Sequence, residues 1–189
     1  LIWKMKDSFK LSPEMNSVYK DIEHPCVPIL AEMERVGILV NFQQFKSFSS
    51  AITTDIKAIE QFVETEIGRK INLKSPKQLS KLLFDERGHL PSRKNKTGAS
   101  TDSKTIQQLM INSNDPILPK ILEFREIHKV KSTYLEPLPS YIAKDGRIHA
   151  RFHQAVTGTG RLSSSDPNLQ NIPIRKSWGL KIRQCFVAE

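Results

Sequence analysis

Residues 41–68, NFQQFKSFSSAITTDIKAIEQFVETEIG, contain the longest amphipathic pattern in the chain. Asn41 is a favourable helix cap and Gly68 a favourable helix end, so the 26 residues between them predict a helix of about 39 Å. The apolar positions of this helix form one stripe: Phe42, Phe45, Ile52, Ile56, Ile59, Val63 and Ile67. A stripe of this length needs a partner that buries it.

Residues 116–136 supply that partner. Asp115 and Pro116 form a second helix start, and apolar residues follow at the same spacing: Ile117, Ile121, Phe124, Ile127, Val130 and Tyr134. Two long helices joined by an insertion predict an antiparallel stalk, with the insertion, residues 69–104, as its tip. A plain helical bundle would give the same pattern.

The insertion has its own helix signals. Ser75 opens a capping box with Gln78, in a helix that ends at Gly88, and residues 100–102 open another short helix. A polar, basic loop, residues 92–98, lies between them. Helix N-termini beside cationic side chains suit phosphate oxygens, although ordinary capped helices on a surface would look similar.

Shorter elements are predicted on both sides of the stalk. Ser12 begins a helix that Pro25 should interrupt, a second helix should end at Gly37, and residues 38–40 suggest a brief strand. Residues 147–153 alternate strictly and predict one strand. One face of this strand would carry Ile148, Ala150 and Phe152, and the other Arg147, His149, Arg151 and His153. No nearby carboxylate or cysteine completes a metal site with the two histidines, so none is predicted.

The charge of the chain is uneven. The 189 residues carry a net charge of +9, of which residues 69–104 contribute +7 and residues 144–189 contribute +5, whereas residues 1–68 carry −3. Two separated basic blocks favour a polyanionic partner such as nucleic acid, although a solvated lysine-rich surface is the alternative. No apolar run approaches the roughly 20 residues that a membrane span needs, so no membrane partner is expected.

Residues 157–173, TGTGRLSSSDPNLQNIP, fit neither a helix nor a strand. A stiff, polar loop can present donors at fixed positions, and the minor groove of a duplex offers acceptors at nearly the same places in every base pair. Arg161, Asn168, Gln170 and Asn171 could donate there, and the three serines suit phosphate and sugar. The alternative is a loop whose side chains bond only its own backbone.

Several stretches of the chain also carry a resemblance. TGTGRLSSSDPNLQNIPIR resembles the segment just before the catalytic palm in family A DNA polymerases, the family of bacterial DNA polymerase I. HPCVPILAEMERVGILVN resembles the segment after the exonuclease-like domain, NLKSPKQLSKLLFDERG and KTGASTDS the thumb tip, and FREIHKVKSTYLEPLP the second thumb helix. The resemblance covers roughly residues 20–189.

The family implies a mainly α (α+β) fold, with a helical thumb and a few short strands from the palm. It divides the chain into the exit of the exonuclease-like domain (1–24), the base of the polymerase domain (25–40), the thumb (41–136) and the incomplete N-terminal part of the palm (137–189). The implied partner is primer–template duplex DNA, bound by a monomer with no obligate protein partner. The implied location is the bacterial cytoplasm, at the nucleoid, with an organelle left open.

The resemblance also implies DNA contacts, residue by residue. Phosphates at the thumb tip would be contacted by Asn72, Lys74, Ser75, Lys96, Ser100, Thr101 and Ser103. The second long helix would line the duplex with Arg125, Lys129, Ser132 and Tyr134. Near the primer end would lie Arg161, Asn168, Gln170, Asn171 and Arg175. Lys74 and Ala99 stand where relatives often have other residues.

Polymerase chemistry uses two metal ions held by paired carboxylates. The acids from residue 144 onward are Asp145, Asp166 and Glu189, and none is paired on a rigid element. We therefore expect no catalytic residue, metal or cofactor in this chain, which alone should be inactive, and Mg²⁺ in the intact parent. The alternative is a stand-alone, non-catalytic duplex-binding accessory protein, although the abrupt ends at Leu1 and Glu189 resemble no natural terminus.

Overall fold

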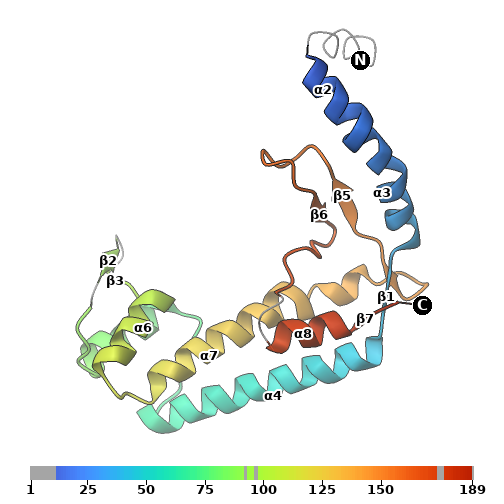
Figure 1. Ribbon diagram of the computed structural model, residues 1–189. Helices are drawn as coiled ribbons and strands as arrows, with labels where there is room; N and C mark the ends of the chain where they lie inside the picture. The colour runs from blue at the N-terminus through green and yellow to red at the C-terminus, as the bar shows by residue number, and fades with distance from the viewer. Residues whose placement is uncertain (1–11, 92, 96–97, 174–176, 189) are drawn as a thin grey trace. The chain divides into compact units, whose positions relative to one another are not determined.

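The computed structural model describes residues 12–91, 93–95, 98–173 and 177–188 (Figure 1). The chain divides into two compact units, one formed by Lys46–Pro137 and the other by Leu1–Phe45 with Leu138–Glu189. Helices dominate, and the strands are few, short and antiparallel. This confirms the predicted fold class.

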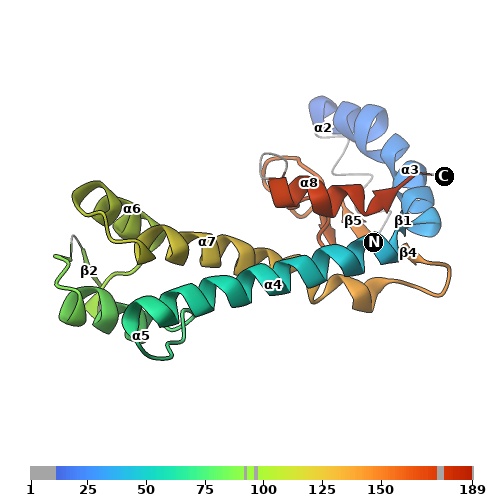
Figure 2. The ribbon, with the colours of Figure 1, turned by 90° about the horizontal axis from the view of Figure 1, so that it is seen from below.

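The stalk consists of two long helices in the Lys46–Pro137 unit. Helix α4 (Phe42–Ile67) is capped by Asn41, whose Oδ1 accepts from the Gln44 N–H at 3.0 Å, and it has the predicted length. Helix α7 (Ile117–Val130), continued by the π-helical turn η3 (Lys131–Leu135), lies beside it and antiparallel in both views (Figures 1 and 2). The buried stripe of α4 includes Phe48, which the sequence pattern missed, whereas Phe42 is half exposed.

The tip has the two predicted helix starts. Helix α5 (Pro76–Ser80) runs into the π-helical turn η2 (Lys81–Glu86), and helix α6 (Ser103–Asn112) follows a small hairpin of β2 (Lys94–Asn95) and β3 (Gly98–Ala99). The Gln78 N–H donates to Ser75 Oγ at 3.3 Å, and the Thr105 N–H donates to Asp102 Oδ1 at 2.8 Å. The buried tip core consists of Leu73, Leu79, Leu82, Leu83, Ile106 and Leu109.

In the other unit, the predicted break at Pro25 is wrong. Helix α2 (Pro13–Val18), the π-helical turn η1 (Tyr19–Glu23) and helix α3 (His24–Val36) follow one another without interruption. The His24 N–H bonds to the carbonyl of Tyr19, five residues earlier, and Pro25 then falls in the first turn of α3. The proline is tolerated because it directly follows the π-helical turn, where the regular i→i−4 bonding is already altered.

Two small sheets complete this unit. Strand β1 (Ile38–Val40), as predicted, lies between β4 (Arg147–Ile148) and β7 (Phe186–Val187), with Ile38 opposite Ile148 and Val40 opposite Phe186. Strand β5 (Arg151–His153) pairs separately with β6 (Ser163–Ser165), with Phe152 opposite Ser164. A 3₁₀ turn, η4 (Leu138–Tyr141), and helix α8 (Ser177–Gln184) complete the element order.

These sheets correct two predictions. Residues 147–153 form two strands in different sheets and not one, because the ladder stops at His149 and Ala150. Ser163–Ser165 form a strand inside a segment predicted to have none, because Arg151–His153 supply a partner. Among the described residues, no helix is both long and apolar enough for a membrane crossing.

Candidate nucleic-acid interface

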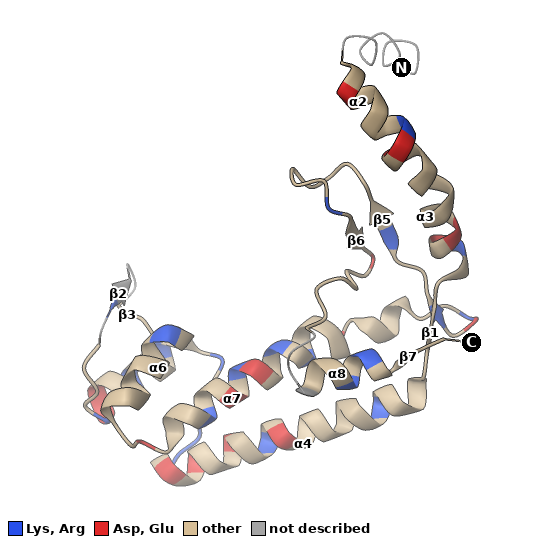
Figure 3. Ribbon diagram, viewed as in Figure 1, with Lys and Arg blue, Asp and Glu red and all other residues tan. Residues whose placement is uncertain are grey.

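A groove of about 1410 Å³ lies in the Lys46–Pro137 unit, between the tip and α7. Its lining includes five basic side chains: Lys74, Lys77, Lys81, Arg125 and Lys129. The acids in the lining are Asp85 and Asp102. Figure 3 shows basic positions both on the tip and along α7. The groove is therefore open and predominantly cationic, as a surface for a polyanion should be.

The groove brings together six of the predicted contacts: Lys74, Ser100, Thr101, Arg125, Lys129 and Ser132. It also contains Lys77 and Lys81, which the sequence reasoning missed. Both are exposed and stand four residues apart on α5 and η2. Residues four apart lie on the same face of a helix, and the capping box predicted a helix here. The sequence therefore already indicated a pair of lysines on one face.

Two of the residues predicted to contact phosphates, Asn72 and Ser75, form hydrogen bonds with the backbone at the start of the tip. Asn72 Oδ1 accepts from the Lys74 N–H at 2.9 Å, and the Asn72 N–H donates to Gln78 Oε1 at 2.8 Å. The Ser75 hydroxyl oxygen caps α5. These bonds fix the turn that holds the exposed Lys74 beside the groove.

Arg125 joins α7 to the segment before α6. Its Nη1 donates to the Thr101 carbonyl, and its Nη2 lies 3.4 Å from Thr101 Oγ1. Burial lowers the pKa of Arg125, and the charge of Asp102 opposes that shift. Ser100 and Thr101 are buried, at 2% and 7% exposure, so their hydroxyls serve the tip interior more than its surface.

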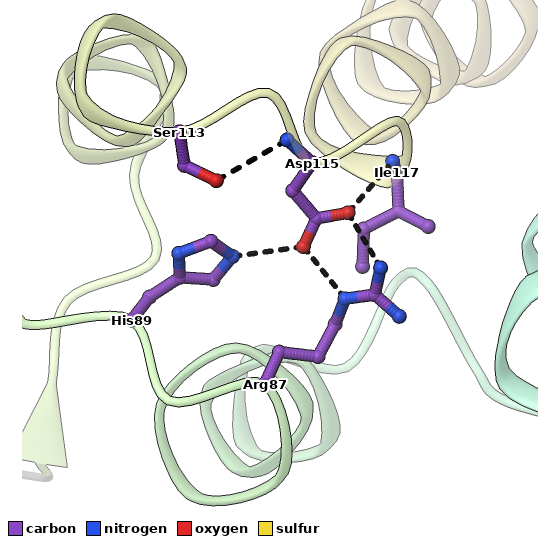
Figure 4. Close-up of polar contacts among 5 residues, drawn as sticks. All are labelled: Arg87, His89, Ser113, Asp115 and Ile117. Atoms are coloured by element: carbon purple, nitrogen blue, oxygen red, sulfur yellow. Dashed lines mark hydrogen bonds and ion pairs between the residues drawn. The ribbon is translucent and has the colours of Figure 1, made fainter.

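A carboxylate network orders the junction between the tip and α7 (Figure 4). Asp115 accepts from Arg87 Nε at 2.6 Å and Nη2 at 2.7 Å, lies 2.8 Å from His89 Nε2, and caps the Ile117 N–H at 3.1 Å. Burial would raise the pKa of Asp115, but hydrogen bonds from Arg87 and then His89 outweigh it, so the pKa lies below its ordinary value. Sequence reasoning found only the cap, because Arg87 lies 28 residues away.

The remaining predicted contacts on this unit differ in exposure. Ser103, Lys129 and Ser132 are exposed. Tyr134 is buried, and burial raises the pKa of its hydroxyl. Lys96 lies outside the described residues, as does Arg175 in the other unit.

The polar loop of the other unit bonds partly to itself. Asn168 Oδ1 accepts from the Gln170 N–H at 3.1 Å and faces Ser164 Oγ at 3.3 Å, while Ser164 Oγ accepts from the Leu169 N–H at 3.2 Å. The side chains of Arg161, Gln170 and Asn171 are exposed. Thus part of the loop bonds to itself, as the alternative interpretation predicted, whereas the side chain of Arg161 is exposed to solvent.

The two histidines of residues 147–153 do not form a pair. His153 Nε2 lies 2.8 Å from Ser165 Oγ, whereas the His149 ring contacts Glu34 and Asp145. Over the part of the chain that is described, no three His, Cys, Asp or Glu side chains are grouped so that they could hold a metal ion.

Comparison with known proteins identifies the family. The profile of DNA polymerase family A matches residues 42–189. DNA polymerase I of Synechocystis sp. is 42% identical over 189 residues, and that of Treponema pallidum is 43% identical over 172 residues. These alignments cover 98% and 91% of this chain but only 19% and 17% of the relatives.

A solved structure of a polymerase domain is also similar to this chain. The POL domain of Pol1 from M. smegmatis, in complex with DNA primer-template and dNTP, matches with a TM-score of 0.83 and 40% identity, over 92% of this chain and 30% of that one. The chain thus spans about a fifth of the length of the curated relatives quoted above. On the extent of the family match and the identity of these relatives, the chain belongs to DNA polymerase family A.

Proposed function

We propose that this chain grips the primer–template duplex within an enzyme of the DNA polymerase I type, which synthesises DNA on a template in replication and repair. The observation that carries the proposal is the cationic groove between the tip and α7. The M. smegmatis neighbour, solved with primer-template DNA, supports the choice of polyanion. In this proposal Lys46–Pro137 form most of the thumb.

The groove suits a duplex of any sequence. Lys74, Lys77 and Lys81 extend from the tip as flexible point charges, and Lys129 is exposed on α7. Such side chains bind phosphates without reading bases, and the release of counterions supplies much of the free energy of binding. Arg125 contributes by keeping the wall of the groove in place through Thr101.

The loop after β5 is proposed to contact the minor groove near the primer end. Arg161, Gln170 and Asn171 are exposed donors there. Because the oxygen of Asn168 accepts within the loop, its amide nitrogen is the atom that can donate outward. Donors of this kind can contact acceptors common to all base pairs.

Phosphoryl transfer is proposed to occur in the intact parent, with two Mg²⁺ ions that activate the primer hydroxyl and stabilise the leaving group. Within that enzyme, this chain is proposed to hold and align the duplex. We further propose that it does so as a monomer, without a protein partner, in the bacterial cytoplasm.

The salt dependence of duplex binding tests the groove. A fluorescent 20-base-pair duplex is titrated with the chain at several salt concentrations, and anisotropy gives the affinity. If about 3–5 phosphates are engaged, the logarithm of affinity should fall against the logarithm of salt with a slope near −3 to −4. Replacing Lys77 or Lys81 by Ala should reduce the magnitude of this slope by about 1 each.

Lys57→Ala is the matched control, because Lys57 is an exposed lysine of α4 outside the groove lining. It should leave the slope within error of the parent chain. If the groove variants and the control behave alike, the duplex does not bind in this groove.

A further inference from the structure

The chain changes sheets between β4 and β5. Strand β4 pairs with β1 and strand β5 pairs with β6, so His149 and Ala150 lie between two ladders. A segment that leaves a ladder needs other partners for its polar groups, and something must fix its new direction. Helix α3, which belongs to the same unit, contacts both the ring of His149 and the backbone of the strand that follows.

Glu34, in the last turn of α3, contacts both sides of this crossing. Its carboxylate Oε1 accepts from the Phe152 N–H at 2.6 Å, and its backbone carbonyl accepts from His149 Nδ1 at 2.8 Å. One residue thereby holds the second position before β5 and the second position within it. The bond from Phe152 to a carboxylate is of the stronger, charge-assisted kind.

The His149 ring is held on three sides. Its Nδ1 faces the Glu34 carbonyl, and its Nε2 lies 3.1 Å from Asp145 Oδ2. The ring also lies against Gly37, where a Cβ would come within 2.8 Å of ring atoms. Glu34 and Gly37 thus form a cradle whose shape depends on the absence of a side chain at Gly37.

A third contact lies farther along the hairpin. Gln154 Nε2 donates to the Glu23 carbonyl and to Glu23 Oε2, both at 2.9 Å. Residues 149, 152 and 154 are therefore all attached to one continuous helix. The loop that carries Arg161 connects the two strands of this hairpin, β5 and β6.

We propose that Glu34 is a positioning residue, which fixes the direction of the β5–β6 hairpin and so presents the Arg161 loop to the duplex. The claim that the hairpin presents Arg161 to the duplex rests on the proposed function. The claim that Glu34 fixes the hairpin rests on the contacts alone. Glu34 touches no duplex in this proposal, since its carboxylate is occupied by the Phe152 N–H.

Amide hydrogen exchange of the full chain, without DNA, tests whether Glu34 fixes the hairpin. In Glu34→Ala, exchange at the Phe152 amide should accelerate about tenfold or more, because a charge-assisted bond is lost. Glu34→Gln keeps an oxygen that can accept and should accelerate it less. Glu32→Ala, which removes an exposed carboxylate paired with Arg35 on the same helix, should change nothing at Phe152. Unchanged exchange at Phe152 in Glu34→Ala would overturn the proposal.

A double-mutant cycle with Arg161→Ala tests whether the fixed hairpin presents Arg161 to the duplex. Glu34→Ala should weaken duplex binding about three- to tenfold when Arg161 is present, and less than twofold when it is absent, because the two residues act on one contact. Glu34→Gln should restore most of the loss. Equal weakening in both backgrounds would reduce Glu34 to a general stabiliser and reject the positioning role.

The two experiments separate this proposal from the proposed function. If the parent chain binds no duplex, the proposed function fails, whereas accelerated exchange at Phe152 still supports the contact that fixes the hairpin. If the duplex binds but Phe152 exchange is unaffected by Glu34→Ala, the positioning role fails and the function stands.

Discussion

The tip of the Lys46–Pro137 unit and the β5–β6 hairpin of the other unit both carry proposed duplex contacts, yet different bonds hold them. Where the tip joins α7, the Asp115 side chain bonds two other side chains, Arg87 and His89, and a helix N-terminus. In the hairpin, side chains bond backbone groups, as Glu34 does at Phe152 and Gln154 at Glu23.

This difference has an energetic consequence. Removal of one charge from a buried network leaves its partners without compensation, and that destabilises the folded state strongly. Removal of one backbone bond frees a local segment while the rest of the unit stays folded. The tip should therefore respond to mutation in its stability, and the hairpin in the accuracy with which it presents its loop.

Asp115→Asn should have the largest effect. The amide keeps the shape and can still cap Ile117, but it removes the charge that faces Arg87 and His89 (Figure 4). The Asp115 side chain is 6% exposed and that of Arg87 is 25% exposed. We expect a loss of about 2–3 kcal/mol, measured by urea unfolding followed by circular dichroism.

The matched control is Glu123→Gln, which breaks the exposed pair with Lys120 on α7. Exposed pairs contribute little, so its loss should stay below about 0.5 kcal/mol. Losses of similar size in the two variants would mean that the Asp115 network is no more important than a surface pair.

Arg161→Ala tests the hairpin at the level of function, in an intact polymerase that contains this chain. A correctly paired primer end places a minor-groove acceptor at a fixed point, and a mispair moves it. Loss of the guanidinium should slow extension of matched ends by roughly one to two orders of magnitude, and of mismatched ends less. Lysine should rescue only partly, because it lacks the planar fork. Equal slowing of matched and mismatched ends would assign Arg161 to bracing its own loop.

Gly37→Ala tests the cradle under His149. Gly37 has φ +67°, and an added Cβ would come within 2.8 Å of the His149 ring and 2.9 Å of the Ile148 carbonyl. Gly68, which ends α4, has a similar φ of +71° with no atom within 4 Å of such a Cβ. Gly68→Ala should lose about 1 kcal/mol to the backbone conformation. Gly37 also has ψ −176°, a combination essentially confined to glycine, so Gly37→Ala should lose more, about 2 kcal/mol from backbone strain and the contacts together.

Thermal unfolding and Phe152 amide exchange measure this difference. Gly37→Ala should accelerate exchange at Phe152, whereas Gly68→Ala should leave it unchanged. If the two substitutions cost the same, His149 moves aside freely and the cradle imposes no constraint on the hairpin.

The contrast between the two regions also explains what the sequence could reveal. The helices of the stalk and tip follow from local signals, because Asn41, Ser75 and Asp102 each cap a backbone N–H three residues later. Lys74 and Lys129 followed from the resemblance to the family and line the groove. These features need only neighbours in the chain or a familiar motif.

The sheet crossing could not be predicted in the same way. The alternation of residues 147–153 continues without interruption, and Ile148 and Ala150 are both buried as it requires. Where the ladder stops, His149 bonds the carbonyl of Glu34, a residue 115 positions earlier in the chain, and no local pattern predicts this partner. The Arg87–Asp115 pair and the pairing of Ser163–Ser165 were missed for the same reason, since each depends on a partner that no local pattern announces.

The smallest expected effect concerns the charge of His149. Its two ring nitrogens face a carbonyl and a carboxylate, both of which only accept hydrogen bonds, so the doubly protonated ring satisfies both. The Glu34 carbonyl and then Asp145 raise the pKa of His149 above its ordinary value of 6.5, against desolvation and the charge of Arg147. Stability from a raised pKa is fully present below the unfolded value and is lost as the pH rises through the folded value.

The contact of the His149 ring with Glu34 and Asp145, which helps to fix the hairpin, should therefore weaken as the pH rises above about 6.5 and not as it falls below that value. The ring-proton chemical shifts of His149, followed by NMR, should give a midpoint above 6.5, and the Phe152 amide shift should change in parallel. Asp145→Asn should lower that midpoint without abolishing the contact with Glu34, because the carbonyl remains. A midpoint at or below 6.5 in the parent chain would show that the Glu34 carbonyl and Asp145 do not favour the protonated ring, and the attachment of the hairpin would then not weaken as the pH rises.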